Sequence, residues 1–92
     1  MPMNNYNAVV KSFNFSPMVE VIPSILYVTF YVPLTQESVT IDFQGTIPQL
    51  SQRFGFKIEN DRTWDFAGFE GRKCVLQKID GKFRFIRFVY EN

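Results

Sequence analysis

The pair Asp80-Gly81 is the feature that most restricts how this chain folds, because it separates two runs of alternating apolar residues. These runs are Arg72 to Ile79 and Lys82 to Tyr90. An Asp-Gly pair in this position favours a two-residue type I′ turn, whose twist matches that of paired antiparallel strands. Such a turn places Ile79 opposite Lys82 and sets the register outward from there. The sequence therefore predicts an antiparallel β-hairpin over residues 72–90.

Strict alternation would give this hairpin two faces. We assign one face to the core, because it places Leu76 opposite Phe85; it carries Cys74, Leu76, Phe83, Phe85 and Val89, with Arg72, Lys78 and Arg87. The other face mixes bases with apolar and aromatic side chains: Val75, Ile79, Ile86, Phe88, Tyr90, Lys73, Gln77, Lys82 and Arg84. That mixture is typical of a platform for single-stranded nucleic acid. It is equally typical of a sheet surface whose lysine stems cover apolar neighbours.

Three more strands are expected upstream, over residues 8–15, 25–32 and 38–43, and residues 19–22 are also strand-like. Residues 25–32 give the strongest signal, because β-branched and aromatic side chains dominate them. Their even positions are purely apolar, whereas the odd positions Tyr27, Thr29 and Tyr31 are amphipathic. The even positions are therefore predicted to face the core.

One short helix is expected over Thr46–Phe54. Thr46 and Gln49 match a capping box, and Pro48 lies in the first turn, where its missing N–H is harmless. Gly55 supplies a left-handed stop. Residues 56–71 look irregular, with a turn at Asn60-Asp61.

The predicted order is strand, long strand, strand, helix, strand, strand, which is the order of the OB-fold, a five-stranded Greek-key barrel. Many α+β sandwiches with one helix on an antiparallel sheet share this order. We therefore expect a β-dominant α+β fold: a small antiparallel sheet, OB-like, with one short helix between the third and fourth strands. A chain of 92 residues suits one domain, spanning residues 1–92. The expected core is Leu26, Val28, Phe30, Val32, Val39, Ile41, Phe43, Leu50, Leu76 and Phe85. The rings of Trp64, Phe66 and Phe69 either plug the open end of the barrel, which we favour, or form a binding surface.

The charge distribution is uneven. The chain has a net charge of +1, but residues 71–92 hold six bases and two acids, a local excess of 6 − 2 = +4. Such an excess attracts phosphate backbones or acidic protein surfaces. The N-terminus lacks the pattern of a signal peptide, and the longest apolar run has ten residues, about half of a membrane span. With one cysteine, no internal disulfide is required, so we expect a cytoplasmic protein without membrane association.

The residue types present argue against catalysis. Histidine is absent, which removes the commonest general base and metal ligand. Cys74 has no histidine to activate it and lies among apolar residues, so a small buried side chain is expected there. Without a nucleophile–base pair or a phosphate-binding glycine pattern, we expect no enzyme activity, no cofactor and no metal site.

The segments Phe69-Glu70-Gly71-Arg72-Lys73-Cys74-Val75-Leu76 and Gly81-Lys82-Phe83-Arg84-Phe85-Ile86-Arg87-Phe88 contain a Gly-Arg/Lys-x-Cys strand that enters a hairpin. In this C-terminal third the chain resembles small proteins of uncharacterised function encoded by phages and mobile elements, associated with DNA replication and recombination. The resemblance implies a place in DNA metabolism. It assigns a role to no individual residue.

Two functions follow as hypotheses. In the first, the chain binds single-stranded nucleic acid, with Lys73, Lys82, Arg84 and Arg87 contacting phosphates and Phe88, Tyr90, Tyr27 and Tyr31 as stacking candidates. In the second, an aromatic-rich sheet surface binds protein, either another copy of the chain or a different subunit. The modest net charge favours the protein interface. The basic C-terminal segment, the strand order and the resemblance favour nucleic acid, which is our leading hypothesis.

Overall fold

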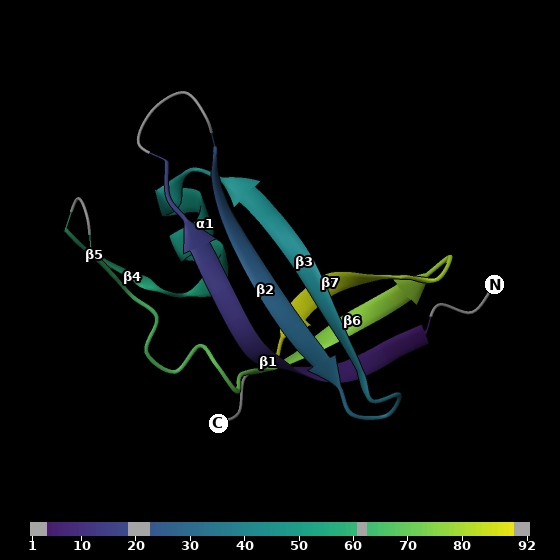
Figure 1. Cartoon of the computed structure of the whole chain (residues 1–92). Coiled ribbons are helices and arrows are strands. Elements are labelled where there is room, and N and C mark those ends of the chain that lie inside the picture. The colour runs from purple at the N-terminus through teal and green to yellow at the C-terminus, as the bar shows by residue number, and fades with distance from the viewer. Residues whose placement is uncertain (1–3, 19–22, 61–62, 90–92) are drawn as a thin grey trace.

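The computed structural model describes residues 4–18, 23–60 and 63–89, and within these ranges the chain is β-dominant with one short helix. Five antiparallel strands form the main sheet in the order β3-β2-β1-β6-β7 (Figure 1). The strands are β1 (Asn4–Ser16), β2 (Ser24–Val32), β3 (Glu37–Gly45), β6 (Lys73–Ile79) and β7 (Lys82–Phe88). Helix α1 (Ile47–Phe54) follows β3, and a small hairpin of β4 (Lys57–Asn60) and β5 (Thr63–Asp65) follows α1. The predicted fold class is confirmed.

The long first strand is what curls the sheet. Residues 4–9 of β1 pair with β6 and residues 9–16 pair with β2, so β1 belongs to both halves of the sheet. The register shifts between Val10 and Ser12, and such a bulge bends and twists a strand. Figure 1 shows the β2–β3 half crossing the β6–β7 half at a wide angle. The result is a half-barrel that is open between β3 and β7, consistent with an OB-like fold.

The turn and the first part of the hairpin agree with the prediction. Asp80 and Gly81 both have positive φ angles, 51° and 79°, as a type I′ turn requires, and Ile79 pairs with Lys82. Further from the turn the strict alternation is wrong. The register shifts between Val75 and Leu76, so that Arg87 pairs with Val75 and Phe88 pairs with Cys74.

This bulge at Ile86 exchanges the faces of the residues beyond it. Arg87, expected on the core face, is exposed, whereas Phe88, expected outside, is only 4 % exposed. The Phe88 ring packs against Phe54 and Phe85, with centroid distances of 6.1 and 5.0 Å. Burial of this large ring stabilises a core that is small. The alternation of apolar and polar residues along one strand does not reveal this stabilisation, so it predicted the wrong face for Phe88.

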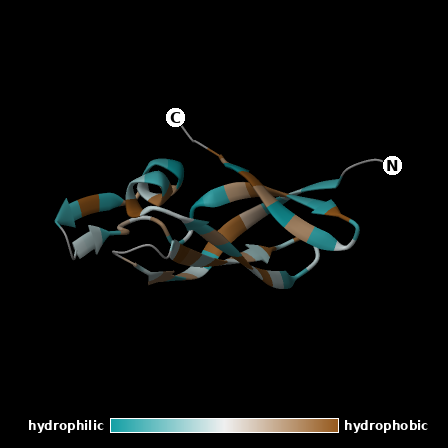
Figure 2. Ribbon diagram, turned by 90° about the horizontal axis from the view of Figure 1, so that it is seen from above, coloured by the Kyte–Doolittle hydropathy of each residue, from teal (hydrophilic) through white to brown (hydrophobic). Residues whose placement is uncertain are grey.

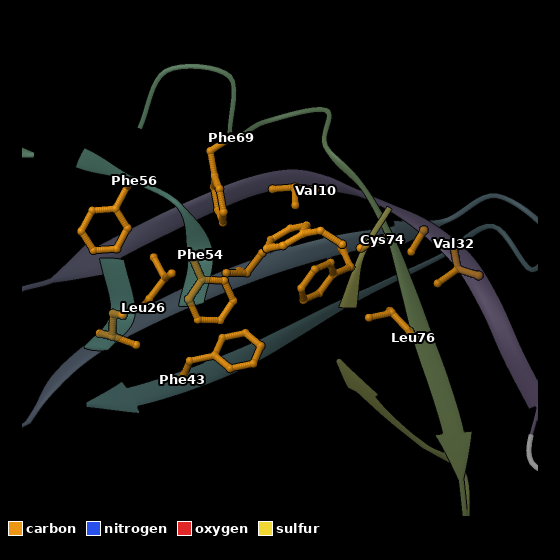
Figure 3. Close-up of a cluster of buried hydrophobic side chains, with 14 residues drawn as sticks. Val10, Leu26, Val32, Phe43, Phe54, Phe56, Phe69, Cys74 and Leu76 are labelled. Atoms are coloured by element: carbon orange, nitrogen blue, oxygen red, sulfur yellow. The ribbon is translucent and has the colours of Figure 1, made fainter. Parts of the chain in front are cut away.

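The core lies on the concave side of the sheet, and Figure 3 shows its side chains converging from β1, β2, β3, α1 and β6. Figure 2 shows hydrophilic and hydrophobic residues alternating along the strands, as a sheet with one buried face requires. The even positions of β2 are fully buried, as predicted. Every residue of the expected core is either buried or packs against the buried cluster.

Helix α1 begins and ends as the sequence predicts. The Thr46 hydroxyl accepts a hydrogen bond from the Gln49 N–H at 3.2 Å, and the Gln49 side chain accepts one from the Thr46 N–H at 3.0 Å. Gly55 ends the helix with a φ of 79°. Leu50 and Phe54 are buried, so the helix covers one end of the half-barrel. No helix in the described ranges is long and apolar enough to cross a membrane.

Residues 56–71 are more ordered than expected, because Ile58 pairs with Trp64 in the β4–β5 hairpin. The predicted turn at Asn60-Asp61 extends outside the described residues, and so does the strand-like segment 19–22. The rings of this region pack on β1: Phe66 stacks on Phe13 at 4.6 Å, and Trp64 contacts Phe15 at 5.3 Å. They therefore plug the end of the half-barrel, the alternative that we favoured.

Candidate nucleic-acid interface

The basic candidates lie together on the outer face of the β6–β7 hairpin. Lys82 pairs with Ile79, Arg84 with Gln77 and Arg87 with Val75, which places all three bases opposite to the buried Leu76 and Phe88. Lys73 stands at the start of β6 on the same outer face and is exposed. Lys73 is six residues along β6 from Ile79, the partner of Lys82, so the four bases form a row about 20 Å long on this face. We call Lys73, Lys82, Arg84 and Arg87 the basic face.

In the described structure, the residues that pair with Lys82, Arg84 and Arg87 are apolar or amide residues: Ile79, Gln77 and Val75. Residues 5, 7 and 9 of β1 continue this face, and they are Asn5, Asn7 and Val9. The Gln77 side chain donates a hydrogen bond to the Asn5 side chain at 3.4 Å, so the neighbours are amides and apolar groups. Within the described ranges, no acidic side chain lies at ion-pair distance from Lys82, Arg84 or Arg87. Three of the four charges are thus uncompensated in this part of the chain.

The two tyrosine candidates lie on the outer face of β2 and have different surroundings. Tyr31 pairs with Val9, and Val9 in turn pairs with Lys73, so one residue separates the ring from the basic face. Tyr27 lies four residues before Tyr31 in β2 and pairs with Asp42, an acid that repels phosphate. The structure therefore brings Tyr31 to the basic face and leaves Tyr27 apart from it.

A third stacking candidate, Phe88, does not reach this surface. Phe88 is buried in the core, so its placement beside the bases was wrong, because the bulge at Ile86 turns it inward. Tyr90 lies outside the described residues. The bulge leaves Ile86 40 % exposed beside Arg84 and Arg87. The sequence correctly predicted Ile86 on the outer face of the hairpin.

Sequence reasoning missed two features of this surface. The first is the contribution of β1, because residues 4–7 include three asparagines and have low β-propensity. The second is the outward direction of Arg87. The spacing of Phe85 and Phe88, three residues apart with Arg87 between them, is a signal for a bulge that would have revealed it.

Two bases of the C-terminal segment serve the fold instead. The Arg72 guanidinium donates from Nη1 to the Phe54 carbonyl at 2.9 Å and lies 3.7 Å from the Phe88 ring centroid. The Lys78 ammonium lies 5.1 Å from the Phe83 ring centroid and 3.8 Å from a Glu37 carboxylate oxygen. The local excess of +4 therefore overstates the charge available to a ligand.

Cys74 is 1 % exposed, and burial raises the pKa of its thiol to about 12, although the nearby Arg72 charge acts in the opposite direction. A neutral, enclosed thiol is a poor nucleophile. Among the described residues, no three potential metal ligands of the His, Cys, Asp or Glu type gather in one place. The Asp65 carboxylate instead accepts a hydrogen bond from the Ala67 N–H at 2.8 Å and stabilises a turn.

In the described residues, the surface is thus an outward row of bases with Tyr31 beside it, on an OB-like half-barrel. Comparisons of the chain with protein-family models, with curated proteins and with solved structures found no match.

Proposed function

We propose that this chain is a non-catalytic binding domain that binds single-stranded nucleic acid through the basic face. The observation that carries the proposal is that Lys82, Arg84 and Arg87 are exposed on one outer sheet face and have no acidic side chain at ion-pair distance in the described ranges, with Lys73 exposed on the same face. Phosphate contacts of this kind supply most of the affinity of sequence-independent binding. The ligand would lie across β7 and β6 toward β1.

Tyr31 supports a nucleic-acid ligand over a generic acidic surface. Tyr31 stands on β2, two strands from β6, in the row formed by Lys73, Val9 and Tyr31, and its backbone is about 10 Å from that of Lys73 at the usual strand spacing. A strand whose phosphates contact Lys73 can therefore stack a base on Tyr31, and such stacking contributes about 1–3 kcal/mol per base. Single strands present unpaired bases for this contact, whereas duplexes do not.

The fold adds an argument by analogy. OB-folds bind oligonucleotides on the face of their second and third strands and with the loop between the fourth and fifth. In this chain that loop is the Asp80-Gly81 turn, and Lys82 and Arg84 follow it directly. The face of β2 and β3 itself carries Asp42 beside Tyr27, so we propose that the ligand lies nearer to the β6–β7 hairpin than to β3.

The test is a titration of labelled single-stranded DNA and RNA at several salt concentrations. Four phosphate contacts predict a slope of about −2.8 for log K against log salt, from about −0.7 per contact on single strands. The double variant R84A/R87A should bind several-fold more weakly, with a slope nearer −1.4. K57E is a matched control, because it changes the net charge by the same −2 at an exposed site on β4.

The proposal fails if wild type does not bind at about 50 mM salt, where contacts with several phosphates are strongest. It also fails if K57E weakens binding as much as R84A/R87A does, because the ligand would then sense only net charge. Tyr31→Ala should weaken binding without changing the salt slope, since stacking releases no counterions.

A further inference from the structure

A pocket adjoins the basic face at the point where β1 leaves β2. β1 pairs with β2 only as far as Val9, and residues 4–8 pair with β6 alone. The pocket lies between residues 7–9 of β1, the start of β6 and Pro33, the residue that follows β2. Its volume of about 390 Å³ is near the lower end of the range for small-ligand sites, about 300–1,000 Å³. The pocket therefore suits one small chemical group.

The lining of this pocket is apolar with two polar groups at the rim. Val9, Val89 and Pro33 supply apolar walls, and both valines are half-buried. The polar groups are the side-chain amide of Asn7 and the ammonium of Lys73, and no acid is present among the described lining residues. Apolar walls with a few placed polar groups are typical of sites that bind a flat heterocycle. The cation adds a contact for a phosphate joined to that heterocycle.

The position of the pocket connects it with the proposed strand path. Lys73 belongs to the basic face, and Val9 stands between Lys73 and Tyr31 in one row across the sheet. A strand that contacts Lys73 and stacks a base on Tyr31 therefore passes the mouth of the pocket. Proteins that recognise single strands commonly splay bases out of the stack and bind them one at a time. An aliphatic side chain of a protein ligand would use only the apolar walls and leave the amide and the ammonium without a role.

Asn7 is the residue that can distinguish one base from another. Its amide presents a hydrogen-bond donor beside an acceptor. Within the described ranges no hydrogen bond occupies this amide, whereas the amide of Asn5 on the same strand accepts one from Gln77. Adenine has the complementary pair on two edges, because its N6 amino group lies between the acceptors N7 and N1. Asn pairs with adenine in two hydrogen bonds for this reason.

We infer that this pocket binds one unstacked base of the nucleic-acid strand and prefers adenine. The inference rests on the proposed function and names the base that the site selects. Val9, Val89 and Pro33 cover the ring, Asn7 pairs with its edge, and Lys73 contacts the phosphate.

The first measurement compares dA and dT strands of about 12 nucleotides, a length within the about 4–16 that one OB-fold covers. The quantity of interest is the ratio of the two Kd values, because intrinsic differences between the strands affect every variant equally. Asn7→Ala should reduce the preference for dA by about 5-fold or more, as expected of a bidentate amide–base pair, and should leave the salt slope unchanged. Asn5→Ala is the matched control, because Asn5 is exposed on the same strand and face but does not line the pocket. The inference is overturned if Asn7→Ala leaves the ratio unchanged, or if Asn5→Ala changes it as much.

The second measurement locates the base by NMR with the wild-type chain. Addition of the dA strand should shift the backbone amide signals of Val9 and Val89, which line the pocket. Shifts at Arg84 and Arg87 without shifts at these two valines overturn the base pocket but leave the proposed function intact. Failure of both strands to bind at about 50 mM salt overturns the proposed function and the pocket together.

Discussion

Arg72 is predicted to be the most important charged side chain for the stability of this fold. It holds the end of α1 to the β6–β7 hairpin, because Nη1 donates to the carbonyl of Phe54, the last helical residue, at 2.9 Å. Its guanidinium also lies over the buried Phe88 ring, with Cζ 3.7 Å from the centroid. Arg72→Met removes both interactions and keeps a flexible apolar stem in the same space.

The expected loss follows from these two contacts. A hydrogen bond from a charged donor contributes about 1.5–3 kcal/mol, and a cation–π contact of a half-buried guanidinium contributes about 1–2 kcal/mol. This hydrogen bond is only part-buried, so water can partly replace the lost donor and the sum is reduced. We expect Arg72→Met to lower the free energy of unfolding by about 2–3 kcal/mol. At about 4–8 °C per kcal/mol for a domain of this size, the Tm should fall by about 10–20 °C.

Urea denaturation followed by Trp64 fluorescence and thermal denaturation followed by circular dichroism measure this change. Arg53→Met is the control, because Arg53 also lies over rings, with its Cζ 5.0, 5.3 and 5.8 Å from the Phe43, Phe54 and Phe85 centroids, but is exposed on α1. Its loss should be about 0.5–1 kcal/mol. If Arg72→Met is no more destabilising than Arg53→Met, the role assigned to the Phe54 and Phe88 contacts is refuted.

Two further predictions concern the helix cap and the cysteine. Thr46→Ala should lower the free energy of unfolding by about 1 kcal/mol in urea denaturation. Thr46→Ser should lower it much less, because serine keeps the capping hydroxyl. Equal losses for the two variants would contradict the capping role. Cys74 has a thiol pKa raised from 9.0 to about 12, so the unfolded chain releases this proton first as the pH rises. Relative to Cys74→Ala, the free energy of unfolding of wild type should therefore stay constant below pH 9 and fall by up to about 1.4 kcal/mol per pH unit above it. Identical pH profiles for the two proteins would show that the thiol is not desolvated.

The sequence by itself determined the features that depend on neighbouring residues. The period of two in residues 24–32 indicated which side of β2 is buried, because successive side chains of a strand point to opposite faces. Thr46, Gln49 and Gly55 set the ends of α1 through contacts within one or two turns. Asp80-Gly81 set its own turn type, because only residues that tolerate positive φ adopt it readily. The element order then indicated an OB-like sheet.

Only the tertiary structure decided which of these faces meet. The bulge at Ile86 arises where Phe88 fits among Phe54, Phe69 and Arg72, and these contacts join residues far apart in the sequence. It moved one stacking candidate into the core and completed the basic face with Arg87. The division of β1 between β6 and β2 separated the bases from Tyr27 and left the edge of β3 open. Local periodicity contains no information on such long-range packing, because register shifts and sheet curvature depend on the fit of many side chains at once.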